Sequence, residues 1–129
     1  MNKRGFTVIE LLVVTVLFFA VGVLFWVQKS NVEAMARDDK RRMALNAMYY
    51  TLEKVYYPAN KAYPKTINAT VLASVDADMF KDPNGVAIGQ KDSNYTYEPL
   101  NCHESVCKGY TLRAKLEKEA DYVKDSQHN

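Results

Sequence analysis

A nearly all-apolar run from Phe6 to Val27 limits what this 129-residue chain can fold into. About 20 apolar residues is the length that an α-helix needs to cross a hydrocarbon layer of about 30 Å. A cleavable secretory signal has a shorter apolar centre of roughly 7 to 15 residues, followed by a small-residue cleavage site. This run is longer, and it ends in FWVQKSN without such a site. We therefore predict a transmembrane helix over residues 6–27.

One charged residue, Glu10, lies inside this run. Even on lenient insertion scales, a carboxylate near the centre of a membrane helix costs roughly 2.5 kcal/mol or more. Such a residue needs either a cation on a neighbouring helix or a position from which its side chain reaches the headgroups. Both explanations are open on this evidence alone.

The segment KRGFTVIELLVV at the start of the chain resembles the processing motif of type IV pilins and pseudopilins. It contains a short basic leader, Gly5, Phe6 and an apolar stretch that includes Glu10. The resemblance implies that residues 1–5 form a leader, that a prepilin peptidase cleaves after Gly5, and that the new amino group of Phe6 is methylated. It also implies that Glu10 pairs with the N-terminal amine of a neighbouring subunit during filament assembly.

The resemblance further implies partners and a location. The partners are other copies of the chain in a helical homopolymer, the prepilin peptidase, an inner-membrane platform protein and a cytoplasmic assembly ATPase. We expect the precursor in the cytoplasmic membrane with its N-terminus in the cytoplasm, and the mature chain in an extracellular filament on the cell surface. The positive-inside rule favours the opposite orientation, because more basic residues follow the apolar run than precede it. We give the motif precedence.

No proline precedes Pro58, so we predict that the helix continues into a soluble half over residues 28–57. The last three turns of this half carry an apolar stripe at helical spacing. We expect the globular part of the chain to pack on these turns only. The residues of the stripe are Leu45, Met48, Tyr49, Leu52, Val55 and Tyr56.

The sequence ARDDKRR, which precedes the stripe, has two interpretations. In the first, Arg41 and Arg42 of one copy would contact Asp38 or Asp39 of another copy in a filament. Alternatively, this is a solvated helix face with pairs inside the helix, such as Asp38 with Arg42.

Residues 58–129 are predicted to form a small head domain. The segments SNYTYEPL and KGYTLRAKLEK are typical of strands, INATVLASVDADMF of a short helix, YYPANKAYPKT of a loop, and KDPNG of a turn. The predicted fold class is α+β, a long N-terminal helix packed against a small antiparallel sheet, and the order of these pieces resembles the pilin plan. The face of KGYTLRAKLEK expected to pack on the helix carries Tyr110, Leu112, Ala114 and Leu116.

Two cysteines, Cys102 and Cys107, lie close together in NCHESVC. In a small domain such a pair favours a disulfide formed in an oxidising compartment, here closing a hairpin or loop between the two predicted strands. A metal site that includes His103 is rejected, because His103 is adjacent to Cys102 and a fourth ligand is missing.

No residue pattern indicates catalysis or a cofactor. There is no Gly-rich phosphate loop and no nucleophile beside a base. Asp76, Asp78 and Asp82 lack the full ligand series of a calcium loop, which favours a solvated acidic loop. Without Lys3 and Arg4 the 17 basic residues become 15, equal to the 15 acidic residues. This balance argues against a nucleic-acid-binding surface, so we expect a non-enzymatic chain with neither cofactor nor metal.

We therefore expect a structural subunit of a type IV pilus-like filament. One alternative is a pseudopilin of a type II secretion or DNA-uptake system, which has the same first half. The cysteine pair and the missing calcium loop favour a pilin over a pseudopilin. A second alternative is a monomeric, signal-anchored surface protein, which predicts an uncleaved leader and tolerance of Glu10→Ala.

Overall fold

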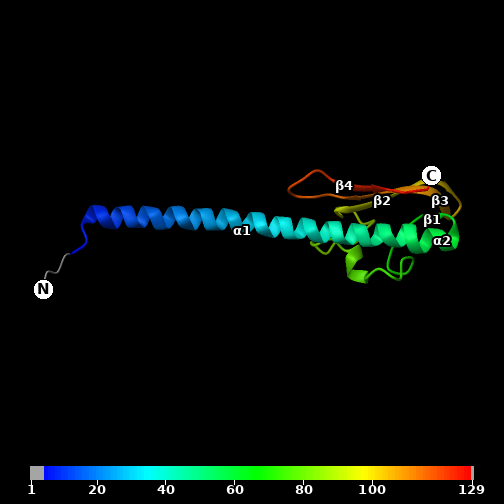
Figure 1. Ribbon diagram of the computed structural model, residues 1–129, viewed down its shortest axis with the longest axis horizontal. Coiled ribbons are helices and arrows are strands. Elements are labelled where there is room, and N and C mark those ends of the chain that lie inside the picture. The colour runs from blue at the N-terminus through cyan, green and yellow to red at the C-terminus, as the bar shows by residue number, and fades with distance from the viewer. Residues whose placement is uncertain (1–4, 129) are drawn as a thin grey trace. The chain divides into compact units, whose positions relative to one another are not determined.

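The computed structural model describes residues 5–128 and divides the chain into two compact units, one ending at Ala34 and the other beginning at Met35. Helix α1 (Val8–Thr51) continues from the first unit into the second (Figure 1). A four-stranded antiparallel sheet belongs to the second unit. The expected α+β class, with a long N-terminal helix and a small antiparallel sheet, is confirmed.

Two short helices follow α1 without a break: the π-helix Leu52–Tyr56 and α2 (Tyr57–Asn60). The N–H of Tyr57 donates to the carbonyl of Leu52, five residues earlier, so the wider π turn comes just before Pro58. A proline in the first turn of a helix costs no needed hydrogen bond, which explains why the chain stays helical past the point where we expected it to end. The helix ends where Lys61 enters the left-handed region at φ 54°.

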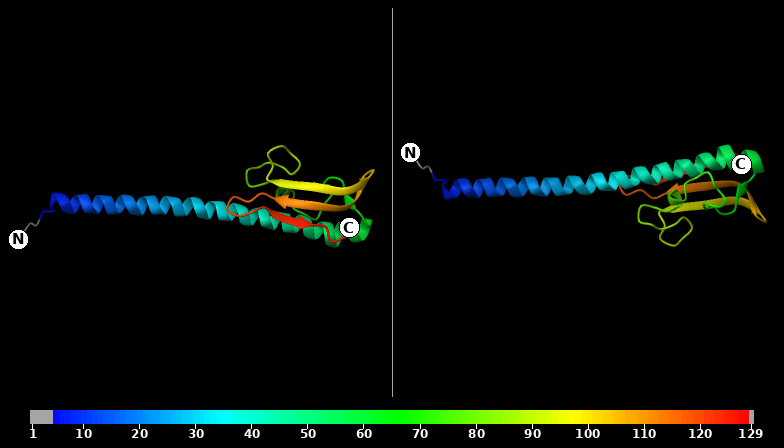
Figure 2. Two further views of the ribbon diagram at one scale, coloured as in Figure 1. Left: turned by 90° about the horizontal axis from the view of Figure 1, so that it is seen from above. Right: turned by 90° about the horizontal axis from the view of Figure 1, so that it is seen from below.

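The central strand of the sheet is β3. The strands are β1 (Tyr63–Pro64), β2 (Tyr95–His103), β3 (Val106–Ala114) and β4 (Tyr122–Asp125). Strand β2 pairs with β3 along one edge, while β1 and β4 pair with opposite ends of the other edge. Figure 2 shows β2, β3 and β4 side by side along α1.

The alternation expected in the third strand is confirmed, because one face is buried against α1. That face carries Tyr110, Leu112 and Ala114, all 0% exposed, and Leu116 at 7%. Opposite it lie Leu45, Met48 and Leu52 of the helix, also 0% exposed. Full burial of a side chain of this size stabilises a fold by roughly 1.5–3 kcal/mol. The helix–sheet layer is therefore the main apolar contact of the head.

Val55 departs from the predicted stripe, since it is 50% exposed. The stripe assumed the α-helical repeat of about 3.6 residues per turn. The π-helix Leu52–Tyr56 turns less per residue, so side chains beyond Leu52 fall out of that phase.

The connection between β1 and β2 contains the short helix we predicted, now seen as the 3₁₀ helix Ala77–Phe80. The turn expected in KDPNG is present, and the N–H of Gly85 donates to the carbonyl of Asp82 at 2.8 Å. Gly85 has φ +85°, a conformation that side-chain-bearing residues avoid, which explains the glycine.

Strands β1 and β4 were not predicted. Strand β1 lies in the segment YYPANKAYPKT, which we predicted as a loop, and β4 lies in the C-terminal tail. Both are too short for alternation to identify them, and both exist because β3 offers them an edge.

Candidate functional site

The chain from Gly5 to Thr7 is exposed and not helical, and α1 begins immediately afterwards at Val8. Thr7 acts as the helix N-cap. Its carbonyl accepts the N–H of Leu11 at 3.1 Å, and its hydroxyl accepts the N–H of Glu10 at 3.3 Å. The bond between Gly5 and Phe6, at which we predicted cleavage, therefore lies outside the helix.

Glu10 lies in the first turn of α1 and is exposed. A carboxylate here interacts favourably with the partial positive charge at the helix N-terminus. Within residues 5–128, no cationic side chain forms an ion pair with it. The position therefore leaves this carboxylate available to a group from outside the described chain.

The rest of the run is apolar on every side of the helix. Its large apolar side chains are exposed, from Phe6 at 75% and Phe19 at 76% to Trp26 at 78%. By length and composition this helix is sufficient to cross a membrane, with a mean hydropathy of 2.8 in its most apolar window. A helix that is hydrophobic all round lies in lipid or inside a bundle of other helices.

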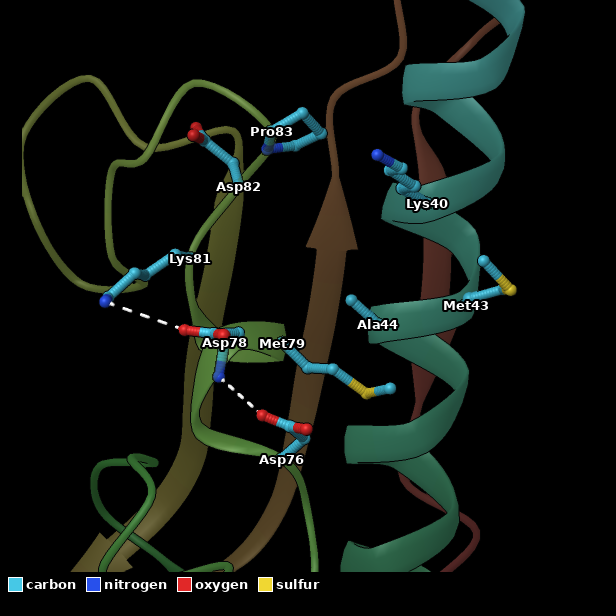
Figure 3. A pocket seen from close by; sticks show the side chains of 9 residues that line it. All are labelled: Lys40, Met43, Ala44, Asp76, Asp78, Met79, Lys81, Asp82 and Pro83. Atoms are coloured by element: carbon cyan, nitrogen blue, oxygen red, sulfur yellow. Dashed lines mark hydrogen bonds and ion pairs between the residues drawn. The ribbon is translucent and has the colours of Figure 1, made fainter.

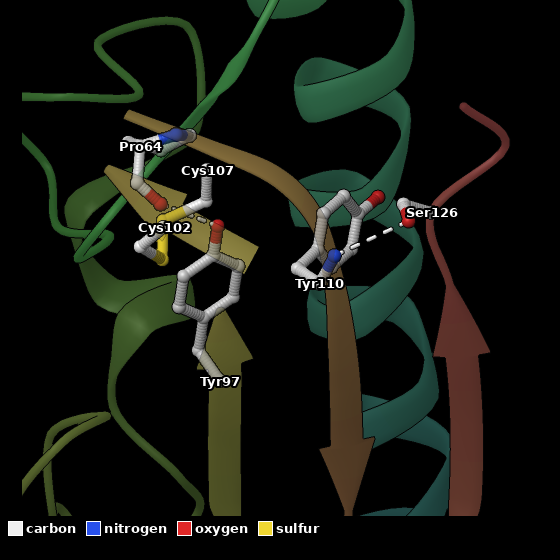
Figure 4. Close-up of a disulfide and its surroundings, with 6 residues drawn as sticks. All are labelled: Pro64, Tyr97, Cys102, Cys107, Tyr110 and Ser126. Atoms are coloured by element: carbon white, nitrogen blue, oxygen red, sulfur yellow. Dashed lines mark hydrogen bonds between the residues drawn. A yellow bond between two sulfur atoms is a disulfide. The ribbon is translucent and has the colours of Figure 1, made fainter. Parts of the chain in front are cut away.

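The predicted disulfide between Cys102 and Cys107 is confirmed, and it closes the β2–β3 hairpin. The two cysteines are directly opposite each other in the sheet, five residues apart in sequence. Figure 4 shows the bond next to Tyr97, whose hydroxyl donates to the carbonyl of Pro64 at 2.7 Å. Tyr97 thus joins β2 to β1, and Cys107 itself pairs with Tyr63 of β1.

Replacing both cysteines with alanine should lower the free energy of unfolding of the head by about 2 kcal/mol, the chain-entropy value for so short a loop. Urea titration of the full chain in detergent, followed by tyrosine near-ultraviolet dichroism, measures the change. Reduction of the unmodified chain should move the midpoint as far as the double substitution does. A midpoint that moves in neither case contradicts the prediction.

The three aspartates considered for a calcium loop have other roles. Asp76 caps the 3₁₀ helix, its carboxylate accepting the N–H of Asp78 at 3.0 Å, and Asp78 forms an ion pair with Lys81 at 3.8 Å. Figure 3 shows these side chains beside a hollow that lies between α1 and the connection from β1 to β2. In the part of the chain that the structure describes, no three His, Cys, Asp or Glu side chains gather into a possible metal site.

Asp82 is buried, contrary to the prediction of a solvated loop. Its carboxylate accepts the N–H groups of Asn84, Val86 and Asn94 at 2.9–3.0 Å, and the side-chain amide of Asn94 at 2.9 Å. Burial raises the pKa of a carboxyl group, but these hydrogen bonds outweigh it and hold the pKa of Asp82 below its usual value. One carboxylate therefore holds both the turn at residues 82–86 and the residue before β2 in place.

The charged segment before the stripe is also part of the head. Arg41 is 1% exposed and donates to Asp38 at 2.7 Å and to Glu117 at 2.8 Å. Arg37 makes two further bonds to Glu117, at 2.7 and 2.8 Å, and Arg42 pairs with Glu119. The expected pair of Asp38 with Arg42 is wrong.

The expectation that the head packs only on the last three turns is also wrong. The backbone N–H groups of Glu117 and Lys118 donate to Asp38 at 2.9–3.0 Å, which joins the β3–β4 loop to the helix well before the stripe. Asp38 is 5% exposed, so it and Arg41 offer no surface to another copy. The helix and the loop are held together here by ion pairs and hydrogen bonds. A stripe of apolar residues therefore does not indicate this contact.

Acid should weaken this cluster. Hydrogen bonds from Arg37 and Arg41 lower the pKa of Glu117 from 4.5 to about 2. A lowered pKa means that the stabilisation is complete above pH 4.5 and is lost as the pH falls toward 2. The urea midpoint should thus fall between about pH 5 and about pH 3 by less in Glu117→Gln than in the unmodified chain. Equal falls contradict the assignment.

Sequence reasoning also missed the buried carboxylate of Glu53. It is 3% exposed and accepts the hydroxyls of Tyr110 at 2.8 Å and Tyr63 at 3.0 Å, and the N–H of Gln127 at 3.2 Å. Burial, together with these bonds to Glu53, raises the pKa of both tyrosines well above the usual range, so they remain donors. Its tyrosine partners are 10 and 57 residues away in the sequence, so no local pattern indicated this role.

The tail beyond β4 closes this polar cluster. Gln127 also donates through its side-chain amide to the hydroxyl of Tyr49 at 2.9 Å. The ring of His128 stacks on Tyr57, with ring centres 4.1 Å apart and planes 4° from parallel. Figure 4 shows the N–H of Tyr110 donating to the Ser126 hydroxyl. The C-terminal residues are therefore held against the end of the helix.

No family model, curated protein or solved structure matches this chain. The functional assignment accordingly rests on its own residues: an exposed apolar helix with one carboxylate, a non-helical segment before it, and a disulfide-closed head.

Proposed function

We propose that the chain is a structural subunit of a type IV pilus-like filament that polymerises through α1. The observation that carries the proposal is the position of Glu10. It is a single carboxylate in the first turn of a helix whose apolar run is otherwise apolar on every side. The Gly5–Phe6 bond lies in the non-helical segment just before this helix. A monomeric membrane anchor has no use for a charge at this depth.

Cleavage after Gly5 supplies the missing cation, because it creates an amino group on Phe6. In a bundle of α1 helices, a neighbouring subunit at the correct stagger brings its amine to Glu10. Any other stagger leaves a buried charge uncompensated, at a cost of about 3–5 kcal/mol. The pair thus selects one register out of many that the uniform apolar surface permits.

The exposed apolar side chains of the first unit support the same function. In the membrane they face lipid, and in the polymer they face the helices of neighbouring subunits. Neither environment requires a polar side, and the helix has none between Glu10 and Gln28 apart from Thr15. Thr15 needs no outside partner, because its hydroxyl donates to the carbonyl of Leu11 at 2.7 Å.

The intact mass of the protein sheared from the surface of its native cells, measured without reduction, tests the proposal. We expect a chain that begins at Phe6, heavier by one methyl group and lighter by the two hydrogens of the disulfide. A Gly5→Val variant is the control, since a branched side chain at the cleaved bond should leave the leader attached. A full-length chain confined to the membrane would contradict the proposal in favour of an anchored monomer. A processed chain that never appears in sheared material would favour a pseudopilin.

A further inference from the structure

The head has two separate hollows of about 320 and 340 Å³, and the one of 340 Å³ lies beside Tyr97. Its apolar part consists of Ile67, Ile88 and Tyr97, and its polar part includes Lys65, Thr66 and Gln90. Small-molecule sites usually have volumes of about 300–1,000 Å³, with an apolar lining and a few polar groups that fix the ligand's orientation. This hollow has the required size and composition.

The apolar wall is fixed in place before any ligand arrives. The Tyr97 hydroxyl donates to the carbonyl of Pro64 at 2.7 Å, and its ring stacks on Tyr110 at 5.4 Å between centres. Figure 4 shows the Tyr97 hydroxyl pointing toward Pro64, with Tyr110 to one side. Ile67 is 6% exposed and belongs to the core. A preorganised wall costs no ordering entropy when a ligand binds.

The polar side of the hollow has side chains whose hydrogen-bonding groups are available to a ligand. Lys65, Thr66 and Gln90 are exposed, and their side chains make no hydrogen bond or ion pair inside residues 5–128. Asn68 uses its side-chain oxygen for the N–H groups of Thr70 and Val71, which leaves its NH₂ group as a donor. None of the lining residues carries a carboxylate.

We propose that this hollow binds a saccharide unit that carries a carboxylate, such as a terminal glucuronic acid. A sugar ring combines an apolar face, which packs on an aromatic wall, with hydroxyl groups around its edge. Amide and hydroxyl side chains both donate to and accept from such groups, while the ammonium of Lys65 pairs with the carboxylate. An aliphatic ligand would leave the polar side unpaired, and a cationic ligand would find no counter-charge. This binding site does not depend on the filament function.

Backbone amide NMR spectra of the full chain in detergent micelles, titrated with a glucuronic-acid-terminated disaccharide, test the proposal. We expect shifts at the amides of Thr66, Gln90 and Tyr97 by about 10 mM, where a ligand with a Kd of about 1 mM is nine-tenths bound. The matching glucose-terminated disaccharide should bind about two- to fivefold more weakly, the worth of one exposed ion pair.

Three variants identify the contacts. Lys65→Ala should remove the preference for the acidic sugar, and Gln90→Ala should weaken both sugars by about two- to tenfold through the lost hydrogen bonds. Lys91→Ala removes an exposed cation next to Gln90 but outside the hollow, so it should bind as the unmodified chain does. Absence of shifts at these amides, or an equal loss of acidic-sugar binding in Lys91→Ala and Lys65→Ala, would overturn the proposal.

Discussion

Glu10→Ala should abolish the filament while the chain still inserts into the membrane and is still cleaved after Gly5. Removal of the carboxylate leaves the amine of the neighbouring subunit buried without a counter-charge, at a cost of about 3–5 kcal/mol for each contact. Since about 1.4 kcal/mol corresponds to tenfold in an equilibrium constant, this loss weakens each addition step more than a hundredfold. The amount of protein in the sheared fraction, set against the processed protein in membranes, measures the effect.

Thr15→Ala serves as the matched control for this experiment. It removes a polar group from the same helix, but one whose hydroxyl bonds only within its own turn. We expect filaments at the level of the unmodified chain. Sheared protein at that level from Glu10→Ala cells would refute the role of the carboxylate and, with it, the filament register described above.

Asp38→Ala should destabilise the head by about 3–5 kcal/mol, a typical loss when one member of a buried ion pair is removed. The Arg41 side chain is 2% exposed and would lose its bond of 2.7 Å to Asp38. The N–H groups of Glu117 and Lys118 would also lose their acceptor. The urea midpoint of the full chain in detergent measures the change.

The neighbouring residue provides the comparison for this variant. Asp39 is exposed, so Asp39→Ala should change stability by no more than about 0.5 kcal/mol. Similar midpoints for the two variants would show that the cluster of Asp38, Arg41 and Glu117 adds nothing to the stability of the head.

The features that could be predicted from the sequence are those whose pattern is local. The apolar run predicts a membrane helix by its length, the alternation in KGYTLRAKLEK identifies a half-buried strand, and two cysteines five residues apart predict their own bond. At the candidate site, a local pattern also predicts where the helix begins. Thr7 and Glu10 have the spacing of an N-cap and its third helical residue, a signal that we did not use.

The features that could not be predicted depend on residues far apart in the sequence. Arg41 and Glu117 are separated by 76 residues, and nothing near either residue indicates the other. Glu53 is polar, so patterning places it in solvent, yet tyrosines 10 and 57 residues away satisfy its carboxylate in the core. Such polar contacts follow from the tertiary fold and become visible only in three dimensions.

The contacts of Gln127 and His128 determine how this protein should be labelled for imaging or purification. Gln127 bonds to Glu53 and Tyr49, and His128 stacks on Tyr57. A tag fused after them would compete with these contacts and weaken the hydrogen bond to Glu53. The tip of the β2–β3 hairpin is the better place for a short insertion. Glu104 and Ser105 are exposed there, and the disulfide behind them isolates the sheet from the inserted peptide. A fluorescent dye attached at this tip would report on the subunit without disturbing its fold.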